Sequence, residues 1–402
     1  FDAALLADAD MIALSPGIAA REAPIAAARA RGVELVGDIE LFARALPAIA
    51  DAVVLAITGT NGKSTVTEMA GAICRAAGRD TVVAGNIGLP VLDALRELQG
   101  QPQRCRAGQL AFVLELSSFQ LETTSSLDAQ VAACLNLSED HLDRYPGMRE
   151  YAQAKARIFN GSGVQVLNRQ DAAVRAMARA GRAIYTFGLD APAAAFDWGL
   201  SGQGDDLWLA QGARRLLPMR QLQVAGMHNV ANALAALALT RAVDLPYEAS
   251  LDALRRFEGL PHRVQKVAEV DGVIYYDDSK GTNVGATVAA INGMRQQVVL
   301  IAGGDGKDQD FAPLAPAVAN RARAVVLIGR DREKIAAVLQ PTSVPLLRAA
   351  SMEEAVHIAA RAARQGDAVL LSPACASFDM FRNYEHRAQV FVEAVRHLAE
   401  RA

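Results

Sequence analysis

The sequence contains few cysteines, and their spacing does not suggest cross-linking. Its 4 cysteines, Cys74, Cys105, Cys134 and Cys375, are far apart and form no C-x-x-C pair. Neither a disulfide framework nor a zinc site is therefore expected. Because such a chain suits a reducing compartment, we expect a cytoplasmic protein.

Long apolar runs and blocks of like charge are also missing. The longest apolar helical stretch, VANALAALALTRAV, is shorter than the roughly 20 residues needed to span a bilayer, and it contains Asn232 and Arg241. No membrane segment is expected. The formal net charge of -3 and the pI near 6.1 argue against nucleic acid or an anionic membrane as the main partner.

The sequence is rich in short apolar runs. Hydrophobic residues make up 51% of the 402 residues, which is enough for several packed cores and roughly two to three domains. Alanine-rich helical stretches separate most of the β-rich runs MIAL, VELV, AVVLAI, TVVAG, AFVLEL, VAACLNL, VQVLN, GVIYYD, QVVLIAG, AVVLIG and AVLLS. This alternation predicts an α/β fold with parallel sheets covered by helices.

Three blocks are expected along the chain. Residues 1–46 form a βα remnant, residues 47–260 contain a phosphate loop and end in a helical stretch, and residues 261–402 form a last α/β unit. The Gly, Gln and Asp residues between Ala191 and Pro218 predict short strands inserted in the second block. Since the chain begins with Phe1 and its first residues are typical of a domain interior, we expect it to lack the start of its first domain.

TGTNGKST, which follows the apolar run VVLAI and opens a helix, is typical of a phosphate-binding loop. Gly59 and Gly62 are three positions apart, unlike the general G-x-x-x-x-G-K-[ST] pattern. A loop with this spacing can bind phosphate in the same way as the general pattern. Its backbone N–H groups face the anion, Lys63 neutralises the charge of the anion, and Ser64 or Thr65 offers a hydroxyl to Mg²⁺. A glycine turn with a helix-capping serine is the alternative, although strand, turn and helix occur in the required order.

Glu115, His141 and Lys155 follow later strands of the same block. Glu115 ends the run AFVLEL at the sheet edge where α/β proteins bind ligands, so beside a phosphate loop it is a candidate Mg²⁺ ligand. A strand-end glutamate of structural role is the alternative. His141 and Lys155 are each also compatible with structural or surface roles. An ammonium would repel Mg²⁺, so Lys155 can take part only if its charge is altered or its role is indirect.

Further polar candidates lie near the end of the second block. GMHNVANALAA places Asn229 and Asn232 on one face of a helix start, with helix capping as the alternative role of Asn229. GLPHR places Arg263 at the domain boundary, where its planar fork suits a transferring phosphate, although a surface arginine fits equally.

Three strands of the last block end in Ser, Thr or Lys residues. The segments are DDSKGTN, GGDGK and SPACASFDMFRNYEHR, with Asp278, Ser279, Lys280, Thr282, Lys307, Ser377 and Tyr384. Neighbouring strand ends of this kind form a concave polar rim that suits a small anionic substrate. Each segment alone is compatible with ordinary turn chemistry.

Eight motifs, in this order and over nearly the whole chain, resemble the Mur ligases of bacterial cell-wall synthesis. They are TGTNGKST, LELSSFQLE, SEDHLDRY, GMHNVANALAA, GLPHR, DDSKGTN, IAGGDGK and LLSPACASFDMF. The resemblance implies three domains: a UDP-binding Rossmann-like domain that is partial here, a central ATPase, and a C-terminal Rossmann-like domain that brings the amino acid. SPACASFD together with GGDGK resembles the D-glutamate-adding branch.

The activity that the resemblance implies is ATP-dependent amide bond formation. D-glutamate would be added to UDP-N-acetylmuramoyl-L-alanine through an acyl phosphate, in the cytoplasm, by a monomer without a nucleic-acid or membrane partner. Lys63, His141, Lys155 and Arg263 would be catalytic.

The family's binding roles also transfer by position to this sequence. The residues assigned to ATP are Gly59, Thr60, Asn61, Gly62, Lys63, Ser64, Thr65, Asn229, Asn232, His262, Arg263 and Asp278. Those assigned to two Mg²⁺ ions are Ser64, Glu115, His141 and a carbamylated Lys155, whose charge would then be negative. Those assigned to D-glutamate are Lys280, Thr282, Lys307, Ser377, Phe378 and Tyr384. Those assigned to the UDP-sugar are Ser15, Pro16, Gly17 and Asn86.

The sequence departs from the family pattern at a few points, and two other readings are open beside the resemblance. Gly281 stands where the family usually has Ala, Asp277 stands where Asn is common, and much of the UDP-binding domain is not represented. A folylpolyglutamate synthase-like ligase shares the first motifs. A non-catalytic ATP-binding protein becomes an alternative if the N-terminal loss is real in the cell.

Overall fold

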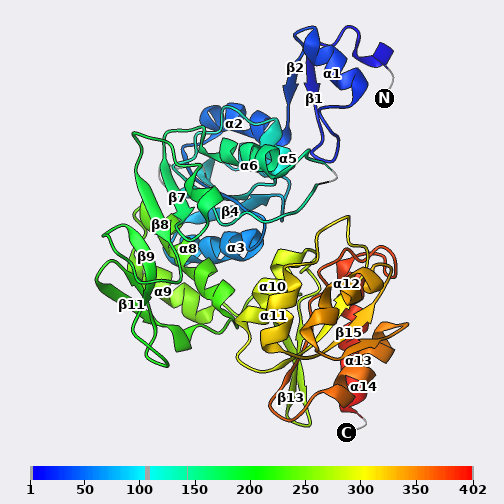
Figure 1. Ribbon diagram of the computed structural model, residues 1–402. Helices are drawn as coiled ribbons and strands as arrows, with labels where there is room; N and C mark the ends of the chain where they lie inside the picture. The colour runs from blue at the N-terminus through cyan, green and yellow to red at the C-terminus, as the bar shows by residue number, and fades with distance from the viewer. Residues whose placement is uncertain (1–2, 105–108, 143, 401–402) are drawn as a thin grey trace. The chain divides into compact units, whose positions relative to one another are not determined.

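The computed structural model describes residues 3–104, 109–142 and 144–400, and the chain divides into two compact units (Figure 1). Unit 1 consists of Phe1–Leu137, Arg144–Leu222 and Val230–Phe257. Unit 2 consists of Ser138–Asp143, Gln223–Asn229 and Glu258–Ala402. Both units combine a mostly parallel sheet with helices, which confirms the predicted α/β class.

The main sheet of unit 1 has nine strands in the order β11-β10-β9-β8-β7-β6-β3-β5-β4. Neighbours from β4 to β9 are parallel, whereas β9, β10 and β11 are antiparallel. The strands are β3 (Ala52–Thr58), β4 (Asp80–Gly85), β5 (Leu110–Glu115), β6 (Val131–Cys134), β7 (Val164–Asn168), β8 (Ile184–Phe187), β9 (Asp197–Ser201), β10 (Trp208–Gln211) and β11 (Arg214–Pro218). The edge strand β11 pairs irregularly, since the register shifts between Leu209 and Ala210.

Helices and a small second sheet complete unit 1. The parallel pair β1 (Met11–Ala13) and β2 (Glu34–Val36) lies near the start of the chain. The α-helices are α1 (Ala23–Ala30), α2 (Asp38–Ile49), α3 (Lys63–Ala76), α4 (Val91–Gln99), α5 (Ser118–Glu122), α6 (Met148–Ala156), α7 (Ala172–Arg175), α8 (Met227–Ala242) and α9 (Tyr247–Arg256). Short 3₁₀ helices are η1 (Ala3–Leu6), η2 (Pro102–Arg104), η3 (Arg157–Phe159) and η4 (Met219–Gln221). The first turn of α8, up to Asn229, groups with unit 2.

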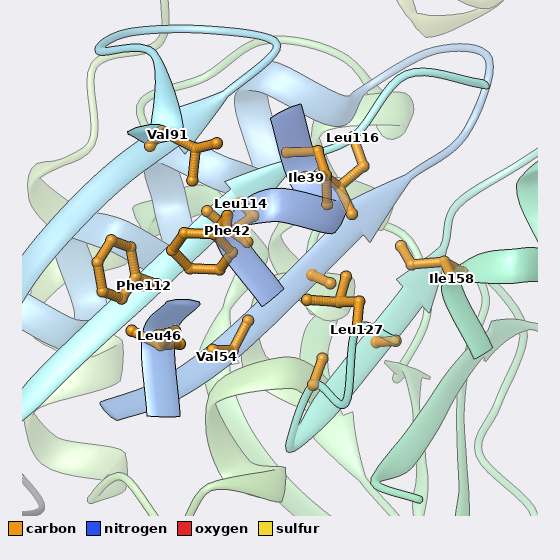
Figure 2. Packing of buried hydrophobic residues seen from close by; sticks show 14 of the residues in the cluster. Ile39, Phe42, Leu46, Val54, Val91, Phe112, Leu114, Leu116, Leu127 and Ile158 are labelled. Atoms are coloured by element: carbon orange, nitrogen blue, oxygen red, sulfur yellow. The ribbon is translucent and has the colours of Figure 1, made fainter. Parts of the chain in front are cut away.

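One side of the unit 1 sheet is packed against α2 (Figure 2). Ile39, Phe42 and Leu46 repeat at helical spacing and are buried against the sheet. Phe42 meets Phe112 of β5 edge to face, with ring centroids 5.0 Å apart and planes at 70°. This packing fixes β5, whose last residue is a site candidate.

The same helix carries a buried carboxylate. Glu40 accepts hydrogen bonds from the backbone N–H groups of Ser125 (2.7 Å) and Ser126 (3.0 Å) and from Arg44 Nε (2.9 Å). Although burial opposes the charge, these bonds together lower the pKa of Glu40 to about 2. Glu40 therefore ties the segment after α5 to α2.

Unit 2 contains a six-stranded sheet in the order β12-β13-β17-β14-β15-β16. Only the β12–β13 pair is antiparallel among these strands. The strands are β12 (Gln265–Val270), β13 (Val273–Asp277), β14 (Val298–Gly303), β15 (Ala322–Ile328), β16 (Leu346–Arg348) and β17 (Ala368–Leu371). The helices are α10 (Val284–Gly293), α11 (Leu314–Arg321), α12 (Arg332–Leu339), η5 (Gln340–Thr342), α13 (Met352–Ala362) and α14 (Tyr384–Ala399).

Both faces of the unit 2 sheet are buried. In β14, Val298 and Leu300 face the core formed with α10, α11 and α12, whereas Val299 and Ile301 face the core formed with α13 and α14. A strand buried on both faces has a continuous apolar sequence. This explains why QVVLIAG is recognisable from sequence.

The apolar runs of the sequence all contain strands, and the segment from Ala191 to Pro218 contains β9, β10 and β11. The sequence analysis missed β8, β12 and β16. β12 carries lysine and glutamate in an antiparallel edge pair, and β16 has only 3 residues, so neither shows a long apolar run.

The cysteines that the structure describes are buried and free: Cys74, Cys134 and Cys375. Burial raises the pKa of each of these thiols to about 12. Cys105 lies outside the described residues.

Among the described residues, no helix combines the length and the apolar character that crossing a bilayer requires.

Candidate functional site

In unit 1, the loop between β3 and α3 has the shape that phosphate binding needs. Gly59 and Gly62 have φ values of 152° and 82°, which favour glycine. A Cβ atom on Gly62 would lie 2.5 Å from Asn232 Oδ1, so any other residue there would have to displace the Asn232 side chain. Ser64 and Thr65 are buried in the first turn of α3, where the helix N-terminus favours an anion.

Lys63 lies along this loop. Its Nζ donates to Gly59 O (2.9 Å) and Thr60 O (2.7 Å). The ammonium is therefore held at the loop by backbone carbonyls, where it can neutralise the charge of a bound phosphate.

Asn136 supports the loop from β6, and the sequence analysis did not select it. Its side chain exchanges two hydrogen bonds with Asn61: Asn61 N donates to Oδ1 (2.8 Å) and Nδ2 donates to Asn61 O (3.0 Å). Thr60 N also donates to Asn136 O (2.9 Å). The available signal was its position just after VAACL, because β6 lies beside β3.

Lys155 lies beneath the same loop rather than on the surface. It is 1% exposed, and its Nζ donates to Gly59 O (2.8 Å) and Thr58 Oγ1 (3.4 Å). The Nζ also lies 4.7 Å from the centre of the Tyr151 ring, and Tyr151 Oη is 3.2 Å from Thr60 Oγ1. The interpretation as a solvated surface lysine is wrong, because Lys155 is part of the loop's support.

Glu115 ends β5 opposite Ile57 of β3. It is 2% exposed, and its Oε1 accepts a hydrogen bond from Asn86 Nδ2 (2.8 Å). Its Oε2 is buried and has no hydrogen-bond partner among the described residues. A buried carboxylate oxygen without a donor fits a bound cation, so Glu115 suits Mg²⁺. Among the described residues, no cluster of three His, Cys, Asp or Glu side chains forms a metal site by itself.

The other predicted residues of unit 1 lie in the turn after β1. Ile18 N donates to Ser15 O (3.0 Å), and Pro16 and Gly17 lie inside this turn. Arg144 Nη2 donates to Ile18 O (3.0 Å). Asn86, assigned with this turn to the UDP-sugar, donates its Nδ2 to Glu115 Oε1 (2.8 Å).

In unit 2, Asn229 and Arg263 line a pocket of about 480 Å³ together with Tyr276 and Lys266. Asn229 Nδ2 donates to Ala225 O (2.7 Å). Although Asn229 and Asn232 share α8, Asn229 groups with unit 2 and Asn232 with unit 1.

His228, between these segments, has a structural role. A Cβ atom on Gly226 would lie 2.6 Å from its Cε1, and one on Gly293 would lie 2.9 Å from its Nδ1. Burial lowers the pKa of His228 to about 4, so its ring is neutral at pH 7 and fills the space that two glycines leave.

The end of β13 holds two buried acids in different ways. Asp277 Oδ2 lies 2.7 Å from His262 Nδ1. Asp278 Oδ2 accepts a hydrogen bond from Ser372 Oγ (2.6 Å), yet burial raises the pKa of Asp278 to about 7. The aspartate at position 277 therefore gives His262 a carboxylate partner.

Of the residues predicted to bind the amino acid, Lys280 and Tyr384 meet at the start of α14. Lys280 Nζ lies 3.7 Å from the centre of the Tyr384 ring, a cation–π contact. Ser377 is buried, Phe378 is 74% exposed, and Thr282 N donates to Lys280 O (2.9 Å). The strand ends of β13 and β17 are therefore adjacent, as the sequence predicts.

Arg387 joins two segments of this rim and was missed by the sequence analysis. Its buried guanidinium donates to Ser279 Oγ (3.0 Å), Ser279 O (2.8 Å) and Cys375 O (3.1 Å). Burial lowers the pKa of Arg387 to about 10, so the group remains charged at pH 7. An arginine inside the motif YEHR gives no signal of burial by itself.

His141 and Lys307 lie together in unit 2. Asp140 is their common neighbour, at 3.7 Å from His141 Nε2 and 3.4 Å from Lys307 Nζ. His141 has a φ of 55° and Lys307 a φ of 50°, both unusual for residues with side chains. Of the predicted metal ligands, Ser64, Glu115 and Lys155 belong to unit 1, and His141 groups with unit 2.

Residues 57–240 match the Mur ligase middle domain, and residues 262–375 match the Mur ligase glutamate ligase domain. The chain is 61% identical to the UDP-N-acetylmuramoylalanine–D-glutamate ligase of Thiobacillus denitrificans, over 99% of this chain and 85% of the relative. It is 57% identical to the protein of the same name from Methylobacillus flagellatus, over 100% of this chain and 86% of the relative.

Solved structures show the same fold at lower identity. UDP-N-acetylmuramate–alanine ligase from Thermotoga maritima has a TM-score of 0.64 and 19% identity, and the alignment covers 97% of this chain and 86% of that chain.

Proposed function

The chain belongs to the Mur ligase family, and from this we propose that it joins D-glutamate to UDP-N-acetylmuramoyl-L-alanine at the expense of ATP. The observation that carries the proposal is the high identity, over nearly the whole chain, to relatives that bear the name of this activity. The product is an intermediate of peptidoglycan synthesis.

The reaction needs two steps because a carboxylate is a poor electrophile at neutral pH. An oxygen of the terminal L-alanine carboxylate first takes the γ-phosphoryl group of ATP, which forms an acyl phosphate and releases ADP. The D-glutamate amine then attacks the carbonyl carbon, the C–O bond to phosphate breaks, and phosphate leaves as the amide forms. The amine loses its proton to solvent.

Phosphoryl transfer depends mainly on alignment and charge neutralisation. The Lys63 ammonium and the N-terminus of α3 support phosphate binding in unit 1. We assign Arg263 to the transferring group and Asn229, Asn232, His262 and Asp278 to the nucleotide.

We assign Glu115 and Ser64 to a first Mg²⁺, and the buried oxygen of Glu115 supports this assignment. Bound Mg²⁺ would supply neutralisation of the phosphate charge. A second ion would require His141 and a carbamylated Lys155. A carbamate keeps one N–H on the nitrogen, so it can retain the bond to Gly59 O while its oxygens carry the negative charge.

The residues of the rim in unit 2 and of the turn after β1 are assigned to the two other substrates. We assign D-glutamate to Lys280, Thr282, Lys307, Ser377, Phe378 and Tyr384. We assign the UDP-sugar to Ser15, Pro16, Gly17 and Asn86. Three domains, 1–46, 47–260 and 261–402, would carry the UDP-sugar, ATP and amino-acid sites, and we propose a cytoplasmic monomer.

The test is phosphate release from ATP and Mg²⁺ with UDP-N-acetylmuramoyl-L-alanine, measured with D-glutamate, with L-glutamate and without an amino acid. We expect release only when the UDP-sugar and D-glutamate are both present. Release with a pteroate substrate and L-glutamate instead would favour the folylpolyglutamate synthase-like alternative. ATP binding without release under any condition would favour a non-catalytic binding protein.

A further inference from the structure

Arg144 is a nearly buried arginine of unit 1 that joins α5 to the turn after β1. Its Nη2 donates to Glu122 Oε2 (2.7 Å) and to Ile18 O (3.0 Å). Its Cζ lies over the Phe119 ring, 4.8 Å from the ring centre. The Arg144 side chain is only 10% exposed. Because Phe119 and Glu122 belong to α5, this one guanidinium connects a helix to a turn that lies 126 positions away from Arg144.

The guanidinium is held in one orientation on the α5 side. Nη2 carries two protons, so it can serve both acceptors at once. The bond to Glu122 is charge-assisted, and the aromatic ring beneath limits rotation of the planar group. α5 is itself fixed, because Gln120 Nε2 donates to Asp38 Oδ2 of α2 (2.9 Å). Arg144 is therefore a rigid support for the carbonyl that its second proton binds.

The turn of residues 15–18 has little packing of its own. Ile18 N closes it by donating to Ser15 O (3.0 Å). Ser15 and Gly17 are exposed, and a Cβ atom on Gly17 would have no neighbour within 4 Å among the described residues. The strands β1 and β2 have 3 residues each. Since a short exposed segment opens at little cost, we expect the position of this turn to depend on the bond from Arg144.

We propose that Arg144 is a positioning residue, which holds the turn of residues 15–18 where it binds the UDP-sugar. The role rests on the proposed function, which assigns three residues of this turn to that substrate. Arg144 acts through Ile18 O and needs no contact with the substrate. When a turn is in its binding position for only a fraction of the time, the apparent dissociation constant rises by the inverse of that fraction. Loss of Arg144 should therefore weaken binding of the UDP-sugar and leave the binding of ATP and D-glutamate unchanged.

The first measurement is hydrogen exchange by peptide, made without any ligand. Arg144→Met keeps a long side chain but removes every donor. We expect the peptides that cover residues 12–22 to exchange about tenfold faster than in the wild type, because a hydrogen bond to a charged group is lost. Peptides from β3 and β5 should exchange as before. Unchanged exchange in residues 12–22 would overturn the inference, since Arg144 would then not hold the turn.

The second measurement is steady-state kinetics in the phosphate-release assay. For Arg144→Met we expect the KM of UDP-N-acetylmuramoyl-L-alanine to rise about tenfold. The KM of ATP, the KM of D-glutamate and the kcat at saturating UDP-sugar should change by less than about twofold. A higher KM with an unchanged kcat is the result of losing binding that ground state and transition state share.

Two further variants make the result specific to the turn. Arg182 is also a partly buried arginine of unit 1, but it donates to Gly163 O (2.9 Å) and Phe159 O (2.7 Å). Arg182→Met should therefore lower the melting temperature without raising the KM of the UDP-sugar. Arg144→Lys is shorter and lacks the planar fork, so it should recover only part of the affinity. If Arg144→Met does not fold, Arg144→Lys is compared with the wild type in its place.

Three kinetic outcomes would overturn the inference while the proposed function stands. The first is an unchanged KM of the UDP-sugar in Arg144→Met. The second is an equal rise in the KM of ATP or D-glutamate, because Arg144 would then only stabilise the fold. The third is an equal rise in the KM of the UDP-sugar in Arg182→Met. Absence of release that depends on the UDP-sugar in the wild-type protein would instead overturn the proposed function, and the inference with it.

Discussion

The phosphate loop of unit 1 is held through its own backbone groups, whereas the predicted amino-acid rim of unit 2 is held by contacts of charged side chains. Lys63 and Lys155 both donate to the carbonyl of Gly59. In unit 2, by contrast, Asp277 meets His262 and Arg387 holds Ser279. A loop that presents backbone groups suits phosphate, because any loop of this shape can bind that anion. A rim of side chains can discriminate between amino acids.

The largest effect should come from removing the ammonium of Lys63, which lies at the phosphate loop. Lys63→Ala should lower the ligation rate a hundredfold or more, because loss of one such charge-stabilising group costs about 3 to 4 kcal/mol. The measurement is kcat for phosphate release, with the melting temperature as a check on folding.

Ser377→Ala, a rim variant, should instead raise the KM of D-glutamate. A loss of kcat in the rim variant as large as that in Lys63→Ala would break the comparison.

Arg387→Met tests whether the rim depends on its buried side chains. The change leaves two acceptors of Ser279 and one of Cys375 without their donor, so we expect unit 2 to lose about 3 kcal/mol of unfolding free energy. Hydrogen exchange measured by peptide should rise in β13 and β17 but not in β3 and β5. Arg387→Lys is the matched control and should recover only part of the protection, since one ammonium cannot reach all three acceptors.

Asp278 should make unit 2 less stable as the pH rises. Its pKa is raised to about 7 by burial, above the value near 4 expected in the unfolded chain. Its contribution is therefore fully present below pH about 4 and is lost as the pH rises through about 7. The free energy of unfolding of Asp278→Asn should rise relative to that of the wild type by about 3 to 4 kcal/mol over this range. A melting-temperature difference that is constant from pH 4 to 8 would contradict this.

Glu40 should give unit 1 the opposite dependence. Its pKa is lowered to about 2, so its contribution is present above the unfolded value near 4.5 and is lost as the pH falls toward 2. Relative to Glu40→Gln, the wild type should be more stable by about 1 to 2 kcal/mol at pH 7. We expect the advantage to shrink between pH 5 and 3 in thermal melts. An advantage that grew on acidification would show that the carboxylate is not held as an anion.

The contrast between the phosphate loop and the rim also explains which features the sequence predicts well. The phosphate loop is local: strand, glycines, lysine and helix follow one another, so Gly59, Gly62 and Lys63 are recognisable without any tertiary knowledge. The strands buried on both faces are equally visible as apolar runs.

Other contacts join residues far apart in the chain, and their partners give no local signal. Asn136 reaches Asn61, 75 positions away, and Arg387 reaches Ser279, 108 positions away. Lys155 resembles a surface lysine until β3 and α6 are placed together. Asp140 stands next to a predicted histidine, yet its Oδ1 meets the Nζ of Lys307, 167 positions away.

Three of the edge strands of the nine-stranded and six-stranded sheets, β11, β12 and β16, affect how the protein meets copies of itself. β11 carries Arg214 and Arg215, and its pairing with β10 is interrupted by a register shift. At one edge of the other sheet β16 is only 3 residues long, and at the opposite edge β12 pairs with a shifted register. Short, irregular or charged edges are poor templates for a strand from another molecule. At the high concentrations of a crowded cell, these three edges should therefore resist the strand-to-strand joining that leads to fibrils.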